Sequence, residues 1–369
     1  MRFVVVADVH LDAPFAWAPP ESARHRRLAL RATLERALAL ADEVDADAVL
    51  SAGDLYEHER ATADTAAFLV ETLGATSRPV VLAPGNHDWH GPASLYAWAR
   101  WPGNVTVFTE DRLRPLALAD GLTLWGAAHR APAGTDGFLD RGFTVDRGGV
   151  HLALFHGSER GGLGLETSGK LPHAPFDATQ IPAAGLHHAF VGHHHRPAAQ
   201  PWHTYPGNPD PLTFGEDGLR GAVVATVDGD GAVDRAWHRI SVTEAHDLTV
   251  DLTGCASVTA VRARVAEALA GREGVARVTL EGELTPDVDL RPREDLSADA
   301  LGLAALDAVV VRDGDLAVAY DIAGLSEEAT VRGRFVRRVL AADLDEAERR
   351  RVLVTGLRAL EGRDDLEVP

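Results

Sequence analysis

Cysteine and lysine are almost absent from this chain of 369 residues. The single cysteine, Cys255, excludes a disulfide within the chain and fits a reducing cytoplasm, where free thiols persist. Lys170 is the only lysine, so nearly all basic side chains are arginines. A genome of high GC content produces the same bias, and we attach no function to it.

Long hydrophobic runs are also absent near the N-terminus. The first apolar run starts after Met1-Arg2 and stops at Asp8. It is too short for the apolar part of a signal peptide and far too short for a transmembrane helix. We therefore expect a cytoplasmic protein that does not associate with a membrane.

Positive charge is scarce as well. The chain has 36 Lys and Arg against 55 Asp and Glu, a formal net charge of −19, and neither 1–240 nor 241–369 is basic. A protein that binds nucleic acid on its own usually carries a basic patch. The composition argues against tight, sequence-independent binding by this chain alone, but it is compatible with a subunit that receives DNA through a partner.

Five short segments place metal-binding side chains directly after apolar runs. They are Asp8-Val9-His10, Gly53-Asp54, Gly85-Asn86-His87-Asp88, His156-Gly157 and Gly192-His193-His194-His195. Short apolar runs that end in Gly or Asp are typical of buried strands in an α/β protein. Because ligand sites in such folds gather where the strands end, we expect the five segments to meet at one edge of one sheet.

The chemistry of these segments suits a pair of divalent transition metals, because it mixes carboxylate, imidazole and amide donors. Asp54 is the natural bridge, since its carboxylate can give one oxygen to each ion. Asp8 and His10 are two residues apart and can reach the same ion, while Asn86 offers a neutral oxygen. The imidazoles favour manganese, iron or zinc over magnesium; they come from His156, His193 and His195.

The remaining members of the set have other predicted roles. A water held between two ions is partly deprotonated near neutral pH and can attack phosphorus. His87 is placed to stabilise developing charge or to protonate the leaving oxygen. Asp88 is a candidate outer partner that fixes the tautomer of His87 or of a ligand.

A simpler interpretation exists for each motif alone. A lone Asp-x-His or Gly-Asp is usually structural, and the run His193 to His195 is also compatible with a surface tract that binds metal adventitiously. The order of all five segments, each at a strand end, makes the metal site the better interpretation.

The five segments resemble the calcineurin-like metallophosphoesterase superfamily, whose pattern runs Asp-x-His, Gly-Asp, Gly-Asn-His-Asp, His and Gly-His-x-His. Within it, the chain is similar to SbcD-type nuclease subunits and YhaO-type DNA repair exonucleases. Two further stretches carry that resemblance: Tyr205 to Glu216, with Tyr-Pro-Gly-Asn-Pro and Leu-Thr-Phe-Gly-Glu, and Thr330 to Arg338. The resemblance implies an α/β fold, a four-layer sandwich of two mixed β-sheets flanked by helices with a small α+β cap domain.

The resemblance also implies roles for the residues that match its motifs. One ion is held by Asp8, His10, Asp54 and His195, and the other by Asp54, Asn86, His156 and His193; His87 is the catalytic histidine. Some relatives carry a second active-site histidine three positions after the Gly-Asp aspartate. Here that position is Glu57, with His58 next to it.

The domain organisation follows from the resemblance and from local patterns. We expect a catalytic domain over 1–240, closed by the hairpin 221–227 and 233–240, a cap domain over 246–325 and a C-terminal helical segment over 326–369. The cap either discriminates DNA substrates or serves as an oligomerisation or structural appendage. The C-terminal helices either dock on the coiled coil of an SMC-like ATPase or pack on the cap.

The sequence is compatible with three functions. The leading hypothesis is a manganese-dependent DNA nuclease in repair or end processing, an exonuclease or endonuclease that works with an SMC-like ATPase and can form a homodimer. The second keeps the metal site but hydrolyses a small nucleotide or cyclic nucleotide. The third is a metal-bound scaffold with a dispensable nuclease activity, which the intact ligand set argues against.

Overall fold

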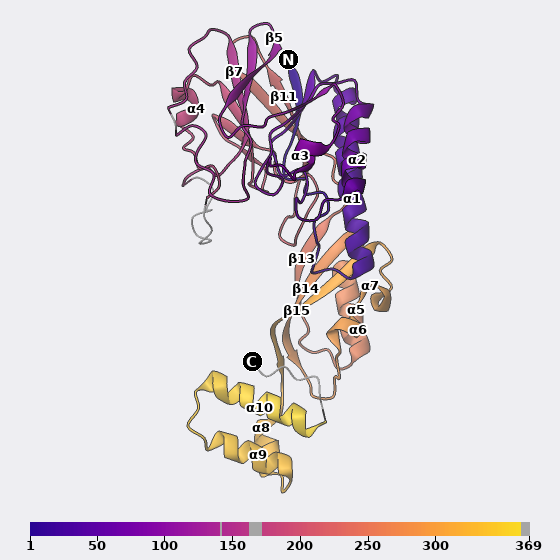
Figure 1. The fold of residues 1–369 in the computed structure, drawn as a ribbon. Helices are drawn as coiled ribbons and strands as arrows, with labels where there is room; N and C mark the ends of the chain where they lie inside the picture. The colour runs from indigo at the N-terminus through magenta and orange to yellow at the C-terminus, as the bar shows by residue number, and fades with distance from the viewer. Residues whose placement is uncertain (141, 162–171, 363–369) are drawn as a thin grey trace. The chain divides into compact units, whose positions relative to one another are not determined.

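The computed structural model of the protein describes residues 1–140, 142–161 and 172–362 (Figure 1). The chain forms two compact units, one of Met1–His246 with Glu273–Val275 and the other of Asp247–Arg272 with Ala276–Pro369. The division into three parts over 1–240, 246–325 and 326–369 stays a prediction, and the end of its last part, 363–369, lies outside the described residues.

The first sheet of the first unit has the strand order β12-β11-β1-β2-β3-β4. Its four parallel strands are β1 (Arg2–Val6), β2 (Ala48–Ser51), β3 (Val80–Leu82) and β4 (Val105–Val107). The predicted hairpin is present as β11 (Gly221–Val227) and β12 (Val233–Arg239), with β11 antiparallel to β1. Every residue of β2 and β3 is buried, which explains why these segments are uninterrupted apolar runs.

The second sheet has the order β5-β6-β7-β8-β10-β9. Its central strands β6 (Leu122–Gly126), β7 (Val150–His156), β8 (His188–Gly192) and β10 (His203–Tyr205) are parallel. The edge strands β5 (Arg114–Ala119) and β9 (Ala198–Ala199) are antiparallel to their neighbours. All residues of β7 and β8 are buried.

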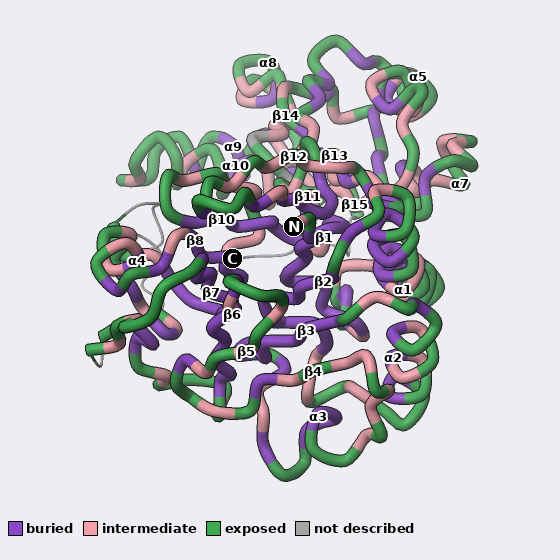
Figure 2. The backbone as a smooth tube through the Cα atoms, turned by 90° about the horizontal axis from the view of Figure 1, so that it is seen from above, coloured by how far each residue is buried: buried purple, intermediate pink, exposed green. Residues whose placement is uncertain are grey.

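The two sheets pack face to face. Phe3, Val5 and Leu50 of the first sheet share one hydrophobic cluster with Leu124 and Leu152 of the second. The central strands of both sheets are the most continuously buried part of this unit, whereas the edge strands β4, β5 and β12 contain no buried residue (Figure 2). Helices α1 (Pro20–Glu43) and α2 (Ala63–Ala75) cover the outer face of the first sheet. The short α4 (Gln180–Ala183) and neighbouring loops cover the second. The predicted sandwich of two mixed sheets flanked by helices is confirmed.

The second unit is built on the three-stranded sheet β13-β14-β15, over Ala245–Asp251, Gly274–Leu284 and Leu306–Val318. Helix α5 (Val258–Leu269) packs on this sheet through Val261 and Val265, and two single-turn helices follow, α6 (Pro292–Asp295) and α7 (Ala298–Leu301). The chain continues into α8 (Ile322–Glu327), α9 (Val331–Leu340) and α10 (Glu346–Leu360), which share a small core of their own.

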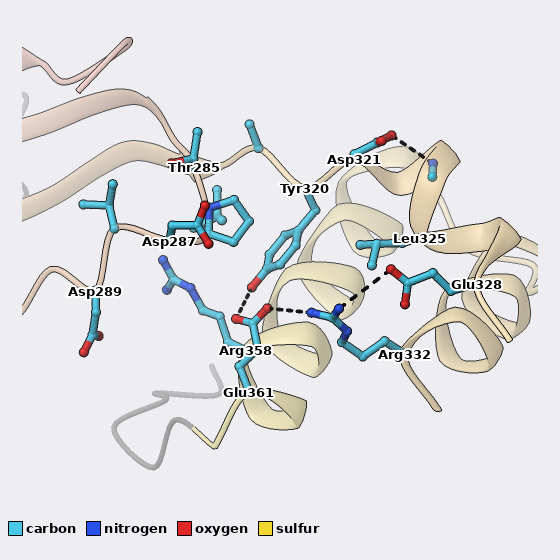
Figure 3. A pocket seen from close by; sticks show the side chains of 15 residues that line it. Thr285, Asp287, Asp289, Tyr320, Asp321, Leu325, Glu328, Arg332, Arg358 and Glu361 are labelled. Atoms are coloured by element: carbon cyan, nitrogen blue, oxygen red, sulfur yellow. Dashed lines mark hydrogen bonds and ion pairs between the residues drawn. The ribbon is translucent and has the colours of Figure 1, made fainter. Parts of the chain in front are cut away.

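A polar cavity of about 930 Å³ lies within the second unit, between residues 285–289 and helices α8 to α10. Some of its polar groups bond one another (Figure 3): the Tyr320 hydroxyl donates to Glu361 at 2.9 Å, and Arg332 lies 3.6 Å from Glu361 and 3.7 Å from Glu328. Across the described residues, no helix has both the length and the apolar character needed to cross a membrane.

Candidate metal centre

The five segments with metal-binding side chains leave strands of both sheets. The first three follow β1, β2 and β3, and the other two are at the ends of β7 and β8. The short helix α3 (Leu95–Trp98) comes after the third segment. The expectation of one edge of one sheet is therefore wrong. A pattern of apolar runs predicts that strands exist but not which sheet each joins. The site is built where the carboxyl ends of strands from two packed sheets come together.

Three motif glycines make room for one imidazole. A Cβ atom on Gly53, Gly85 or Gly192 would lie 2.7, 2.8 or 2.7 Å from Nδ1 of His156, closer than non-bonded atoms approach one another. The three glycines come from the ends of β2, β3 and β8, while His156 ends β7. The glycine at the start of these three segments is thus required by the close packing of His156, a candidate ligand from another strand.

His156 directs one ring nitrogen at a group of oxygens. Its Nδ1–H donates to the Ala52 carbonyl at 2.9 Å, so Nε2 is the nitrogen that faces this group and that can bind a metal ion in place of a proton. Nε2 lies 3.1 Å from Oδ1 of Asn86 and 3.2 Å from Oδ2 of Asp54. Burial by itself lowers the pKa of His156, but the neighbouring Asp54 raises it to about 9. A positive charge, either a proton on Nε2 or a metal ion in its place, therefore stabilises this group of three atoms.

Asp54 is shared between two imidazoles. Its carboxylate is 2% exposed, and Oδ2 lies 3.2 Å from Nε2 of His156 and 3.6 Å from Nε2 of His10. Oδ1 accepts the backbone N–H of His87 at 2.8 Å. Burial acts to raise the pKa of Asp54, and the charge of His156 holds it well below its usual range. Asp54 is therefore an anion located between two groups of ligands.

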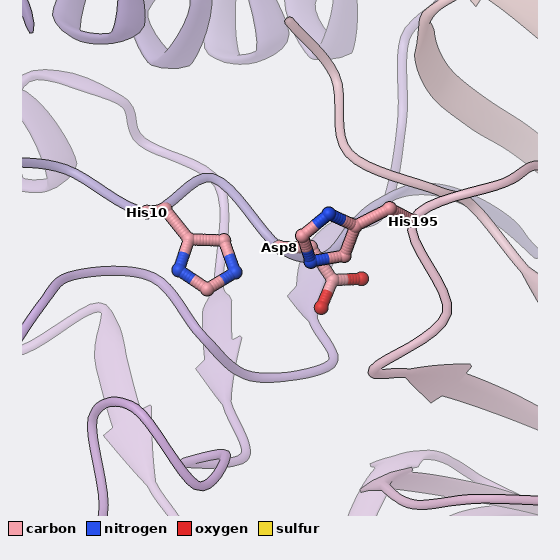
Figure 4. A group of neighbouring side chains, drawn as sticks. All are labelled: Asp8, His10 and His195. Atoms are coloured by element: carbon pink, nitrogen blue, oxygen red, sulfur yellow. The ribbon is translucent and has the colours of Figure 1, made fainter. Parts of the chain in front are cut away.

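A second group of donors consists of Asp8, His10 and His195 (Figure 4). One ligand atom from each lies within 4.8 Å of the others. Nδ1 of His10 bonds Glu57 at 2.7 Å, and Nδ1 of His195 bonds Glu216 at 2.9 Å. The buried Nε2 of His10 has no hydrogen-bond partner. Such an orphaned nitrogen costs free energy unless another group, such as a cation, binds it.

The backbone at four of the predicted ligands has the left-handed conformation that L-residues rarely adopt. The φ angles are +53° at Asp8, +50° at His10, +52° at Asp54 and +102° at His193. Such conformations persist where the surrounding structure enforces them, and they cluster at functional sites. Here they occur directly after β1, β2 and β8, where these strands end at the candidate site.

His193 lies beside the group that contains His156. The centroids of the two rings are 5.1 Å apart, and burial lowers the pKa of His193 to about 2, so the ring is neutral. Its backbone N–H donates to the Asp8 carboxylate at 2.9 Å. The structure places His193 next to the cluster, although the tight groups of donor atoms found among the described residues do not include it.

His87 is the exposed member of the site, with 46% of its side chain accessible. Its Nδ1 lies 2.9 Å from Oε2 of Glu57, and this hydrogen bond raises the pKa of His87 to about 9. The ring is edge-on to His10, with centroids 4.8 Å apart. Its exposure and charge fit a group that meets a phosphate ester.

Asp88 supports the site in a different way from the one expected. Its carboxylate accepts the backbone N–H groups of Asp54 at 3.1 Å, Leu55 at 2.8 Å and Gly85 at 2.6 Å, and the Tyr96 hydroxyl at 2.6 Å. Among the residues that the structure describes, these partners are main-chain amides and a phenol, and none is an imidazole. Asp88 thus holds the turn that presents Asp54, rather than fixing the tautomer of His87.

The sequence motifs missed the carboxylates and imidazoles that support the ligands. Glu216 lies in the stretch that carried the family resemblance, but its bond to His195 was not predictable from it. His129 is fully buried and its Nε2–H donates to the His156 carbonyl at 2.8 Å. The ring of His173 lies 5.2 Å from that of His193. Neither histidine has a motif that would have identified it.

The residues present fit two divalent metal ions. The donors are carboxylate, amide and imidazole in one buried cluster, Asp54 is shared, and a buried imidazole nitrogen is left without a partner. This donor set is typical of transition metals rather than of magnesium alone.

Comparison with known proteins adds a family. A model of the calcineurin-like phosphoesterase family matches residues 1–197. The chain is 26% identical over 282 residues to the DNA double-strand break repair protein Mre11 of Methanopyrus kandleri (strain AV19). That alignment covers 68% of this chain and 59% of the relative, so the match spans less than two thirds of the relative's length.

Solved structures that align with this chain include TT1561 of Thermus thermophilus, at 13% identity and a TM-score of 0.38, covering 64% of this chain and 98% of that one. Yfce, a phosphoesterase from E. coli, aligns at 14% identity with a TM-score of 0.28, and this alignment covers 64% of this chain and 99% of that one.

Proposed function

The chain belongs to the calcineurin-like phosphoesterase family, which implies a metal-dependent hydrolase of phosphoesters, and from this premise we propose that it is a two-metal DNA nuclease. The observation that carries the proposal is the position of Asp54, whose Oδ2 lies between Nε2 of His10 and Nε2 of His156. The similarity to a DNA double-strand break repair protein supports DNA as the substrate.

Each ion has its own proposed ligands around the shared Asp54. One set adds Asp8, His10 and His195, and the other adds Asn86, His156 and His193. The distances of 3.1 to 3.6 Å support Asn86 and His156 on one side of Asp54 and His10 on the other. Asp8 lies within 4.8 Å of His10 and His195 and also of Asp54 and His156. Two divalent ions also add about four positive charges to a chain of net charge −19 and invert the field locally, which favours an anionic substrate. We propose manganese, because imidazole donors select against magnesium.

The protein's own residues position and protonate the substrate. When bound, the two ions activate water as a nucleophile and polarise the phosphoryl group. His87 is exposed beside the cluster, and its imidazolium form can donate a proton from Nε2 to the leaving oxygen. Glu57 accepts from Nδ1 of the same ring at 2.9 Å, so the donating nitrogen is directed away from Glu57.

Because the chain is acidic, we propose that a partner protein supplies the basic surface that binds DNA. We propose an SMC-like ATPase that presents DNA, with α9 and α10 as the docking element and the cytoplasm as the compartment. Apolar side chains on these helices support a docking role, since Val331 is 72%, Leu340 44% and Val352 40% exposed. A homodimer through the first unit is a further part of the proposal.

The test is cleavage of an end-labelled duplex and a hairpin in manganese, with and without the ATPase. His87→Ala should retain its metals and lose about 10²–10⁴-fold in turnover, the usual contribution of a general acid. His25→Ala, an exposed histidine of α1, is the matched control and should cleave like the wild type. Full activity of His87→Ala would refute its role. Absence of DNA cleavage, alone and with the ATPase, together with turnover of bis-(p-nitrophenyl) phosphate would refute DNA as the substrate.

A further inference from the structure

Glu57 bonds two imidazoles at once. Its Oε1 lies 2.7 Å from Nδ1 of His10, and its Oε2 lies 2.9 Å from Nδ1 of His87. The carboxylate is 19% exposed, so most of its hydrogen-bonding capacity is used within the protein. One ring is a proposed metal ligand and the other is the proposed acid. The two oxygens of Glu57 therefore connect two different functions.

The backbone holds Glu57 in place between the segments that carry these rings. The N–H of Glu57 donates to the carbonyl of Leu11, directly after His10, at 2.9 Å. The N–H of His58 donates to the carbonyl of His87 itself, also at 2.9 Å. The main chain at Glu57 and His58 is thus hydrogen-bonded to the segment that carries His10 and to the segment that carries His87. Little conformational freedom has to be lost when its side chain meets the two rings.

We propose that Glu57 is a positioning residue that fixes the tautomer and orientation of His10 and His87 together, a role that rests on the proposed two-metal hydrolase. Because a carboxylate only accepts, Nδ1 must carry the proton in both rings. Nε2 of His10 is then the free ligand nitrogen facing Asp54, and Nε2 of His87 points away from Glu57 toward the substrate side. Carboxylates that orient ligating imidazoles in this way contribute strongly to metal affinity.

A metal ion held by His10, Glu57 and His87 is the competing interpretation of the same three side chains, whose ligand atoms lie within 4.8 Å of one another. It would require His10 to bind ions through both nitrogens, since its Nε2 already faces Asp54 at 3.6 Å. The separations of 2.7 and 2.9 Å are those of direct N–H···O⁻ hydrogen bonds. The geometry therefore favours the hydrogen-bonded bridge.

The test compares two glutamates that support ligands. Glu57→Gln has the same size but replaces one accepting oxygen by a donor. Glu216→Gln does the same to His195 and does not touch His87. Manganese binding by calorimetry should weaken about 10–100-fold in both variants. Turnover of bis-(p-nitrophenyl) phosphate at saturating manganese should fall further in Glu57→Gln than in Glu216→Gln. The exposed Glu59→Gln is the control and should match the wild type.

Two results would overturn the proposal: wild-type manganese affinity in Glu57→Gln, or equal turnover of the two glutamine variants at saturating metal. A third readout needs no variant. Long-range ¹⁵N–¹H spectra of the metal-free wild type should show a proton on Nδ1 of both rings, and an unprotonated Nδ1 on either ring contradicts the bridge. Binding of three manganese ions per chain supports the competing metal site instead. Because none of these measurements uses DNA, they stand even if DNA proves not to be the substrate.

Discussion

Replacing Gly192 by alanine tests the construction of the metal site without touching a ligand. A Cβ on Gly192 would lie 2.7 Å from Nδ1 of His156 and closer still to the Ala52 carbonyl oxygen. These are the two atoms whose 2.9 Å hydrogen bond fixes the His156 tautomer. The φ of Gly192 lies outside the left-handed region, so alanine introduces a steric conflict and no backbone strain. We expect the added methyl group to push His156 away from Asp54 and Asn86.

The expected effect has two parts. Overpacking a tight interior costs about 1–3 kcal/mol, or roughly 2–12 °C of melting temperature at roughly 2–4 °C per kcal/mol. The second part is metal-dependent. Manganese at about 100 times its Kd stabilises the wild type by about 2.7 kcal/mol, and a 100-fold weaker site at the same concentration gains only about 0.4 kcal/mol.

Calorimetric melting with manganese and with a chelator measures both parts, together with the metal content of the purified protein. Gly103→Ala is the matched control, because a Cβ there meets nothing within 4 Å and its φ is not positive. Gly103→Ala should melt like the wild type and retain the full manganese-induced shift. If Gly192→Ala shows the same melting temperature and shift as Gly103→Ala, the idea that this glycine makes room for His156 is wrong.

Two further predictions concern the first unit away from the metals. Arg26 is 1% exposed and donates to Asp210 at 2.7 Å. Arg26→Ala leaves this buried carboxylate without a cation, although Thr33, Val242 and Thr243 still donate to it, and should cost about 3 kcal/mol in urea denaturation, the lower end of the range for a broken buried pair. A cost below about 1 kcal/mol, typical of exposed pairs, contradicts this. His188 is buried and bonds Thr204 at 2.8 Å, and burial lowers its pKa to about 3. Below pH 6.5 the unfolded chain therefore takes up a proton that the folded protein does not, and about 2 kcal/mol is lost at pH 5. His188→Gln, which can still bond Thr204, should lose less stability between about pH 7.5 and 5, and equal losses in both proteins would refute the assignment.

The residues that the sequence could identify are those that interrupt an apolar run. Asp8, Asp54 and His156 each follow several buried residues, and a polar side chain at such a place has no structural reason to be there unless it has a partner. The hairpin around Asp228 to Gly231 was predictable from its local turn signal. Both inferences need only neighbours in sequence.

What the sequence could not provide depends on contacts between distant segments. No local pattern indicated that β7 and β8 belong to a different sheet from β1, because buried parallel strands of either sheet have the same composition. The bond between His195 and Glu216 joins residues 21 positions apart, with strands β9 and β10 between them. Asp88 was expected near an imidazole, but the backbone amides of Asp54 and Leu55 lie closer because the turn after β3 packs against the end of β2.

The segment 52–57 after β2 is the physical centre of the site, although its Gly-Asp motif is the shortest of the five. It contributes the Ala52 carbonyl that orients His156, the shared carboxylate of Asp54, and Glu57, which bonds His10. Three of the proposed ligand imidazoles, those of His10, His156 and His195, have a bonded Nδ1, and the first two take their acceptor from this one segment. Each of these two rings reaches the segment from another strand. The orientation of His156 is therefore fixed only after both sheets have packed, whereas that of His10 needs only β1 and β2 to pair. We expect binding of the proposed ions to be coupled to the folding of the first unit, since their proposed ligands come together only in the folded unit.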